Sequence, residues 1–313
     1  MKKFFLVVSI MGLLQAQVRN TDIAPFLNSK QIEHITLLDQ KILDIKEVNG
    51  VKFSEISDLA YNHKTEKLYF VSDEGKLFVF EASFSDKIDS LHALNGVTLV
   101  KKKGQKFKHW CHDSEGLTLD NKGELYVSFE GRAKIGRFSE NGRMATTYKL
   151  PRVLKDPKNY RSRNKSLEAL TWHPKYGLLT AAEWPLKHMH KKKQTIYALN
   201  GKKWHFRAEA ESKSAVVAME VMDDGNIMVI ERSYIDLIHP FIITIKKIYL
   251  NRCKNKERIC ESEILVKMNS HKGWSIDNFE GLARVGKHSY LMVSDDNDNF
   301  LQQTLLIYFE VKE

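Results

Sequence analysis

Cysteine, proline and long apolar runs are all scarce in this sequence. Its 313 residues include three cysteines and six prolines. No Cys-x-x-Cys pair is present, so a structural zinc site of the usual kind is not expected. The Gly-x-Ser-x-Gly elbow of serine esterases is also missing. After the amino-terminal segment no run approaches about 18 apolar residues, so we expect no later transmembrane helix.

The first 17 residues, MKKFFLVVSIMGLLQAQ, read as a secretory signal peptide. Lys2 and Lys3 precede an apolar run over 4–14, and a small residue, Ala16, follows it. The sequence therefore predicts a mature chain of residues 18–313 that is periplasmic or secreted, as for a bacterial signal of this kind. An oxidising compartment would favour a disulfide between Cys253 and Cys260, which lie between two strand-like runs, with Cys111 left over.

The charge is basic, with a formal net charge of +10. The excess lies in loop-like stretches such as VKKKGQKFKHW and HMHKKK. Two interpretations stay open, namely solvated loop charge and attraction of an anionic substrate or of the acidic cell envelope. Nucleic acid is not an expected partner, because no helix, zinc or aromatic-stacking motif accompanies the charge.

A repeated pattern dominates the rest of the sequence: an acid, a short apolar strand, a polar turn, a second apolar strand and another acid. Examples are DSEGLTLDNKGELYVSFE at 113–130 and NFEGLARVGKHSYLMVSD at 278–295. The first acid of each copy is Asp58, Glu115, Glu168, Glu220 (or its neighbour Met219) and Glu280, at separations of 57, 53, 52 and 60 residues. Strand-rich repeats of about this period indicate a β-propeller, whose blades are four-stranded antiparallel sheets.

The sequence therefore predicts an all-β fold, a single propeller. Five copies favour five blades, and six remain open if the insert 134–165 or the first fifty residues contain a degenerate blade. The segment HITLLDQKIL at 34–43 is expected to pair with the carboxy-terminal blade and to close the ring.

The repeated carboxylates are the main functional signal. A second acid ends the second strand of each copy: Asp73 with Glu74, Glu130, Glu183, Glu231, and Asp295 with Asp296. Carboxylates that converge on one channel mouth repel each other unless a positive group neutralises them. Oxygen ligands from separate blades suit Ca²⁺, or Mg²⁺ with retained waters. Alternatively, each acid accepts hydrogen bonds from backbone N–H groups of the next blade or pairs with Arg or Lys.

These motifs resemble those of the phytase-like family described as having esterase-like activity. The matching segments are SDLAYN with FVSDEG, DSEGLTL, SLEALTW with AAEWPL, VIERSY, and NFEGLA with VSDDND, in this order over residues 50–312. The resemblance implies an exported propeller, usually six-bladed, with a metal-dependent phosphoesterase or esterase activity. In such propellers several carboxylates hold Ca²⁺, while Lys and Arg bind phosphate.

Two functions follow as hypotheses. In the first, the protein hydrolyses an anionic small-molecule ester, and Arg232 holds the anion. His112, which precedes the second copy, is a further candidate for acid–base chemistry. The expected ligands for Ca²⁺ are Asp58, Glu115, Glu168, Glu280, Asp295 and Asp296. In the second hypothesis, the protein is a non-catalytic propeller that binds an envelope ligand or protein at its channel mouth.

Overall fold

The computed structural model describes residues 17–25, 30–162, 165–236, 238–254, 258–299 and 301–312. The predicted signal peptide lies almost entirely outside these residues. Strands account for nearly all of the regular structure, and the single α-helix of the described part, α1 (Arg152–Lys155), has one turn. No helix in the described part has the length and apolar character that crossing a membrane requires.

Four consecutive antiparallel strands form each of the first two blades. Blade 1 contains β6 (Ile56–Asn62), β7 (Lys67–Ser72), β8 (Lys76–Phe84) and β9 (Ile88–Thr98). Blade 2 contains β10 (Ser114–Leu119), β11 (Leu125–Phe129), β12 (Lys134–Phe138) and β13 (Met144–Thr147). Turns between the first two strands carry the Asn, Asp and Gly residues that tight reversals need, as in Asp120–Gly123.

The next two blades repeat this arrangement. Blade 3 contains β14 (Leu167–His173), β15 (Gly177–Ala182), β16 (Lys193–Ala198) and β17 (Lys203–Arg207). Blade 4 contains β18 (Ala215–Val221), β19 (Ile227–Ser233), β20 (Ile242–Lys254) and β21 (Ile259–Asn269). A parallel bridge between His205 and Ile259 joins their outer strands into one sheet. The hairpin β20–β21 carries the predicted disulfide between Cys253 and Cys260.

Blade 5 combines the two ends of the chain. It contains β22 (Asn278–Arg284), β23 (Ser289–Asp295), β24 (Leu305–Val311) and the amino-terminal strand β3 (Ile35–Asp44). β3 pairs antiparallel with β24, and β1 (Gln17–Asn20) and β2 (Gln31–Ile32) extend the sheet beyond it. The predicted closure of the ring by the amino-terminal strand is therefore confirmed. A small hairpin, β4 (Glu47–Val48) and β5 (Val51–Lys52), leads into blade 1.

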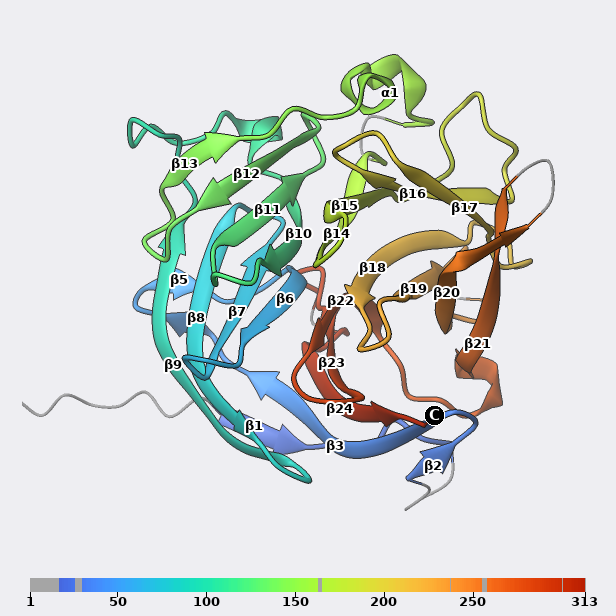
Figure 1. The fold of residues 1–313 in the computed structure, drawn as a ribbon. Coiled ribbons are helices and arrows are strands. Elements are labelled where there is room, and N and C mark those ends of the chain that lie inside the picture. Colours follow the sequence, from blue (N-terminus) through green and yellow to red (C-terminus); the bar gives the residue numbers. More distant parts are fainter. Residues whose placement is uncertain are drawn as a thin grey trace, which may run out of the picture.

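The described residues form five blades. The inner strands β6, β10, β14, β18 and β22 contact one another in this order, and β22 contacts β6 (Figure 1). The expectation of six blades from the family resemblance does not hold here. Residues 134–147 belong to blade 2, and β3 belongs to blade 5. In the described part of the connection to blade 3, the only helical elements are α1 and the 3₁₀ turn η2 (Pro157–Asn159).

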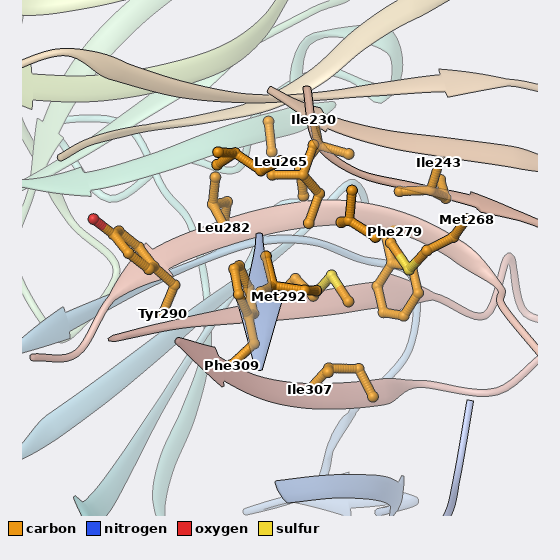
Figure 2. Packing of buried hydrophobic residues seen from close by; sticks show 14 of the residues in the cluster. Ile230, Ile243, Leu265, Met268, Phe279, Leu282, Tyr290, Met292, Ile307 and Phe309 are labelled. Carbon is orange, nitrogen blue, oxygen red and sulfur yellow. The ribbon is translucent and has the colours of Figure 1, made fainter. Parts of the chain in front are cut away.

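Apolar side chains fill the spaces between neighbouring blades. Between blades 4 and 5, for example, Ile230 and Met268 lie in one cluster with Phe279, Met292 and Phe309 (Figure 2). Because apolar side chains from both blades fill the space between them, the inner strands are held rigidly around the axis. Their ends therefore position polar side chains reproducibly at the mouth of the propeller.

Candidate metal centre

Each inner strand begins with a β-bulge at the same place. One residue per blade is left out of the pairing there, and in blade 2 the irregularity also includes Gly116: Ser57, Glu115, Glu168, Val217 and Glu280. A bulge turns a side chain away from the sheet, so these five positions face the same end of the central channel. Three of them are glutamates.

The Gly that follows the bulge glutamate in two blades has a packing reason. A Cβ on Gly116 would lie 2.7 Å from Leu170 Cβ of the next inner strand, and one on Gly281 would lie 2.8 Å from Asp58 Cα. The Glu-Gly-Leu motif therefore combines a carboxylate at the bulge with close contact between blades. Leu117 and Leu282, the third residues of the motif, are buried.

The bulges correct the alignment of the first acids. Asp58 lies one residue past the bulge position of blade 1, and Glu220 lies three residues past that of blade 4. The equivalent residues are Ser57 and Val217. The ring of first acids therefore has three members rather than five.

The residues at the ends of the second strands form another ring, in which one of the five positions carries a cation instead of an acid. The residues that face the start of each inner strand are Asp73, Glu130, Glu183, Arg232 and Asp295. In blade 4 the equivalent position is Arg232, which pairs with Ala215 as Asp295 pairs with Asn278. Glu231 points elsewhere, and its carboxylate lies 2.7 Å from the buried Lys246 Nζ.

Two overlapping groups of three carboxylates result from these rings. Asp113, Glu115 and Glu130 form the first group, and Glu130, Glu168 and Glu183 form the second. Within each group one oxygen per residue lies within 4.8 Å of the others. Among the described residues, no lysine or arginine forms a salt bridge with Glu115, Glu130 or Glu168. The negative charge of these three side chains is thus not neutralised by direct pairing.

Burial and mutual repulsion perturb this cluster strongly. Burial, followed by the charges of Asp113 and Glu183, raises the pKa of Glu130 to about 8. Burial raises the pKa values of Glu115 and Glu168 well above the ordinary value. The charges of Glu168 and Glu130 add to the effect on Glu115, and those of Glu183 and Glu130 add to the effect on Glu168. Burial and Glu55 raise the pKa of Asp73 to about 8, and its buried Oδ1 has no hydrogen-bond partner within the described residues. Such a cluster is costly unless it holds a cation.

Oxygen-only donors from several blades fit Ca²⁺ by their chemistry. The residues that suit it best are the two carboxylate groups, because their oxygens are close together and because, among the described residues, Glu115, Glu130 and Glu168 have no salt bridge to a lysine or arginine. Of the residues predicted to bind the ion, Glu115 and Glu168 belong to these two groups. Asp113, Glu130 and Glu183 were not among the residues predicted to bind the ion, although the second repeated acid was a signal for two of them.

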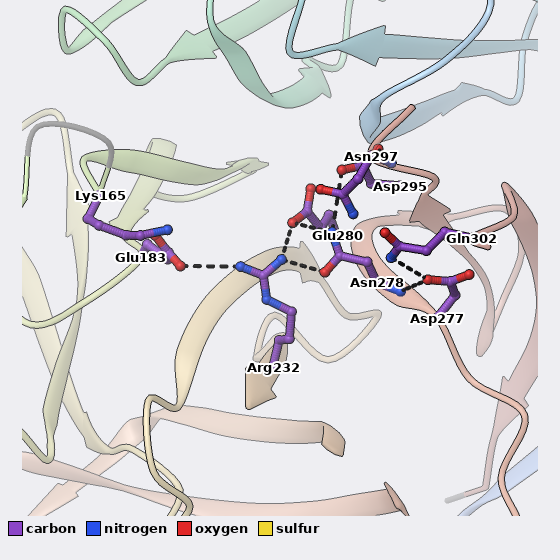
Figure 3. A network of polar contacts seen from close by, with 9 residues as sticks. All are labelled: Lys165, Glu183, Arg232, Asp277, Asn278, Glu280, Asp295, Asn297 and Gln302. Carbon is purple, nitrogen blue, oxygen red and sulfur yellow. Dashed lines mark hydrogen bonds and ion pairs between the residues drawn. The ribbon is translucent and has the colours of Figure 1, made fainter. Parts of the chain in front are cut away.

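Glu280 lies in a different environment from Glu115 and Glu168. The Arg232 guanidinium pairs with its carboxylate, and Arg232 also lies 3.3 Å from Glu183 Oε1 (Figure 3). Burial would lower the pKa of Arg232, but Glu280, Glu183 and Glu168 raise it overall. Lys165 Nζ lies 2.6 Å from the other oxygen of Glu183. These two cations therefore neutralise the side of the mouth formed by blades 3 to 5.

Asp295 belongs to the same mouth. It is buried, its Oδ1 accepts a hydrogen bond from Asn297 N at 2.8 Å, and burial with the charge of Glu280 raises its pKa to about 9. Asn278 Nδ2 bridges the two acids, at 3.0 Å from Glu280 Oε1 and 3.4 Å from Asp295 Oδ2.

Asp58 and Asp296, both predicted as metal ligands, lie outside the two carboxylate groups. The buried Asp58 accepts hydrogen bonds from the backbone N–H groups of Leu59, Leu117 and Leu282 at 2.7–3.0 Å, which ties three blades together. Asp296 accepts one from Glu55 N at 2.9 Å and so joins blades 5 and 1. Both fit the alternative expectation, in which the acid accepts hydrogen bonds from backbone N–H groups of neighbouring blades.

A cleft of about 1210 Å³ opens beside the carboxylates. Asp73, Asp113 and Glu130 line it, and so does His112, whose Nδ1 lies 3.3 Å from Asp73 O. Arg132 and Lys155 add positive charge to the same cleft. The structure thus places His112 next to the first carboxylate group, whereas Arg232 lies farther round the mouth.

A family model, described as phytase-like with the esterase-like activity of phytase, matches residues 51–298. The chain belongs to the phytase-like family. The match spans four of the five blades completely and the first two strands of the fifth. No curated protein matches this phytase-like chain.

Several solved structures are weakly similar to this phytase-like protein. The virginiamycin B lyase of Staphylococcus aureus is 10% identical with a TM-score of 0.40, and the alignment covers 95% of this chain and 99% of that one. The β-propeller domain of Cps50 (Swd1) from Myceliophteria thermophila is 11% identical with a TM-score of 0.37, over 80% and 65% of the two chains. U3-55K is 7% identical with a TM-score of 0.41, over 83% and 97%.

Proposed function

We propose that this phytase-like propeller is a Ca²⁺-dependent hydrolase of phosphate or other anionic esters that works outside the cytoplasm. Two groups of closely spaced carboxylates beside a cleft with positive residues carry this proposal, since Glu115, Glu130 and Glu168 have no salt bridge to a lysine or arginine of the described residues. The disulfide between Cys253 and Cys260 suits an oxidising compartment such as the periplasm or the exterior of the cell.

Different side chains would bind the ion and attract the substrate. Asp113, Glu115, Glu130, Glu168 and Glu183 would hold the ion through carboxylate oxygens. A bound Ca²⁺ supplies charge that polarises an ester oxygen and lowers the pKa of a water molecule. Arg132 and Lys155 attract the anionic group into the cleft, because they are exposed cations on its lining.

Two more residues have positioning roles. Arg232 holds Glu183 and Glu280 in place by its ion pairs, so the second carboxylate group keeps its geometry. His112 lies beside the first carboxylate group and is the residue that would transfer a proton to the leaving oxygen.

The experiment compares hydrolysis of a phosphomonoester, a phosphodiester and a short acyl ester, each with chelator or with Ca²⁺. We expect turnover only with Ca²⁺, and a decrease of at least about 100-fold in Glu115→Gln and Glu168→Gln, since each loses a ligand charge. Glu220→Gln is the matched control, because Glu220 is an inner-strand acid at the opposite end of the channel that hydrogen-bonds to Thr171.

The alternative is a non-catalytic propeller that binds an envelope ligand or protein at its mouth. The ion pairs of Arg232 and Lys165 favour it, because they show that some mouth acids are already neutralised internally. Ca²⁺-dependent stabilisation without turnover of any of the three esters would support this alternative and reject the hydrolase.

A further inference from the structure

Two kinds of residue line the cleft. The acids belong to blades 1 and 2, whereas the turn before β10, the β11–β12 loop and the connection 148–166 contribute apolar and basic residues: Trp110, Arg132, Ala133, Lys155, Pro157 and Tyr160. An apolar ring next to an anionic group would match this second set.

Trp110 is the unusual member of this lining. Its side chain is 60% exposed, although it is among the largest apolar side chains of the protein. A large indole left in water loses the free energy that burial would supply. Because it lines the cleft, this exposed indole offers a flat apolar surface against which an aromatic ring can stack.

The turn that carries Trp110 is firmly anchored. In η1 (His109–Cys111) the carbonyl oxygen of Cys111 accepts a hydrogen bond from Lys134 Nζ at 2.6 Å. The Lys134 ammonium group also lies 3.4 Å from the centre of the Phe129 ring. A Cβ on Gly131 would lie 1.9 Å from Trp110 O, so the turn and the β11–β12 loop are in close backbone contact. The indole is thus presented from a fixed backbone.

We propose that Trp110 is a stacking platform for a flat aromatic ring in the alcohol part of the ester, while Arg132 and Lys155 hold the anionic group. The identification of the ligand as an ester rests on the proposed function. The preference for an aromatic ring is a property of binding and does not require turnover. Stacking on a tryptophan contributes about 1–3 kcal/mol for a nucleobase, which corresponds to roughly 5- to 150-fold in affinity.

Phenylphosphonate and methylphosphonate test this preference in the Ca²⁺-loaded protein. They carry the same anionic group, and their phosphorus–carbon bond is not hydrolysed. By calorimetry we expect the wild type to bind phenylphosphonate at least about tenfold more tightly. Trp110→Ala should lose this preference while its affinity for methylphosphonate stays the same, and Trp110→Phe should keep most of it. Tyr234→Ala, which removes an exposed aromatic ring that does not line the cleft, is the control.

Three results would overturn the proposal: equal affinities in the wild type, no binding of phenylphosphonate, or a preference that survives Trp110→Ala. The outcome is separable from that of the ester assay. Ring preference without hydrolysis of any ester would reject the proposed hydrolase alone, and hydrolysis without ring preference would reject the platform alone.

Discussion

At the scale of single residues, a shift of one position decides what a carboxylate does. Glu115 occupies a bulge and faces the channel mouth, whereas Asp58 lies one residue past the bulge and is buried between inner strands. Asp58 is satisfied by three backbone N–H groups. Glu115 instead has other carboxylates as neighbours. Removing the two negative charges should therefore have opposite consequences for the free energy of unfolding.

Glu168→Gln should stabilise the cation-free protein and weaken its response to Ca²⁺. The substitution removes one charge from a cluster in which burial and the carboxylates of Glu183 and Glu130 disfavour ionisation. A ligand at about 100 times its Kd stabilises the folded state by about 2.7 kcal/mol. We expect this increment to fall by about 1.4 kcal/mol or more in the variant, a tenfold loss of affinity.

Thermal melts in chelator and over a Ca²⁺ titration measure both effects. Glu220→Gln should leave the Ca²⁺-dependent increment unchanged, because Glu220 lies at the other end of the channel. Equal increments in Glu168→Gln and the wild type would refute the placement of the ion.

Asp58→Asn should destabilise the protein without changing its response to Ca²⁺. An amide has one acceptor oxygen, so its NH₂ group would face a backbone N–H that now bonds to Asp58. Leaving buried donors unsatisfied costs about 2–3 kcal/mol. Urea unfolding measures this loss, and Asp86→Asn, at an exposed turn, should change the free energy of unfolding by less than about 0.5 kcal/mol. A weakened Ca²⁺ response in Asp58→Asn would contradict its role between blades.

At the scale of strands and blades, much of the architecture was predictable from the sequence. Alternating apolar strands and turn residues recur in each copy, so the inner hairpins, the outer strands and the closing role of 34–43 followed from local chemistry. The bulges did not follow, because an extra residue in one strand leaves no distinctive residue type. Aligning copies by their acids therefore put Asp58 and Glu220 into the ring, and it overlooked Arg232 as the blade 4 member of the second ring.

The closing strand should control the stability of the whole ring. Leu37 of β3 is buried in the cluster between blades 4 and 5, and its strand pairs with β24. Leu37→Ala should cost about 2–5 kcal/mol, since it leaves a cavity in a packed core. Leu38→Ala, at the half-buried neighbouring position, should cost clearly less. Urea denaturation followed by fluorescence and circular dichroism measures both, and a loss for Leu37→Ala no larger than for Leu38→Ala would show that closure does not depend on this core.

At the scale of the whole molecule, the propeller gathers negative charge at one end and compensates only part of it. Arg232 and Lys165 neutralise the side formed by blades 3 to 5. The side formed by blades 1 and 2 keeps Asp73 and the group of Asp113, Glu115 and Glu130. A global property, the pH dependence of stability, should therefore report on the local site.

Without divalent cations, the protein should lose stability as the pH rises from about 5 to 9. Burial raises the pKa of Asp73 and Glu130 to about 8, and that of Asp295 to about 9. Unfolded carboxyl groups titrate near pH 4, so between these values the folded state binds more protons than the unfolded state. Stability is then greatest below the unfolded pKa and is lost as the pH passes the folded values.

Each unit of pKa difference corresponds to about 1.4 kcal/mol, and repulsion couples the groups, so we expect a combined loss of at least about 3 kcal/mol. Thermal melts in chelator should show the melting temperature falling by roughly 5 °C or more across this range. Saturating Ca²⁺ should remove most of that fall, because a cation favours the ionised carboxylates. Since the ion replaces protons, its stabilising effect should be largest at high pH. A melting temperature in chelator that rises or stays constant with pH would show that these carboxylates are not held uncompensated in the folded state.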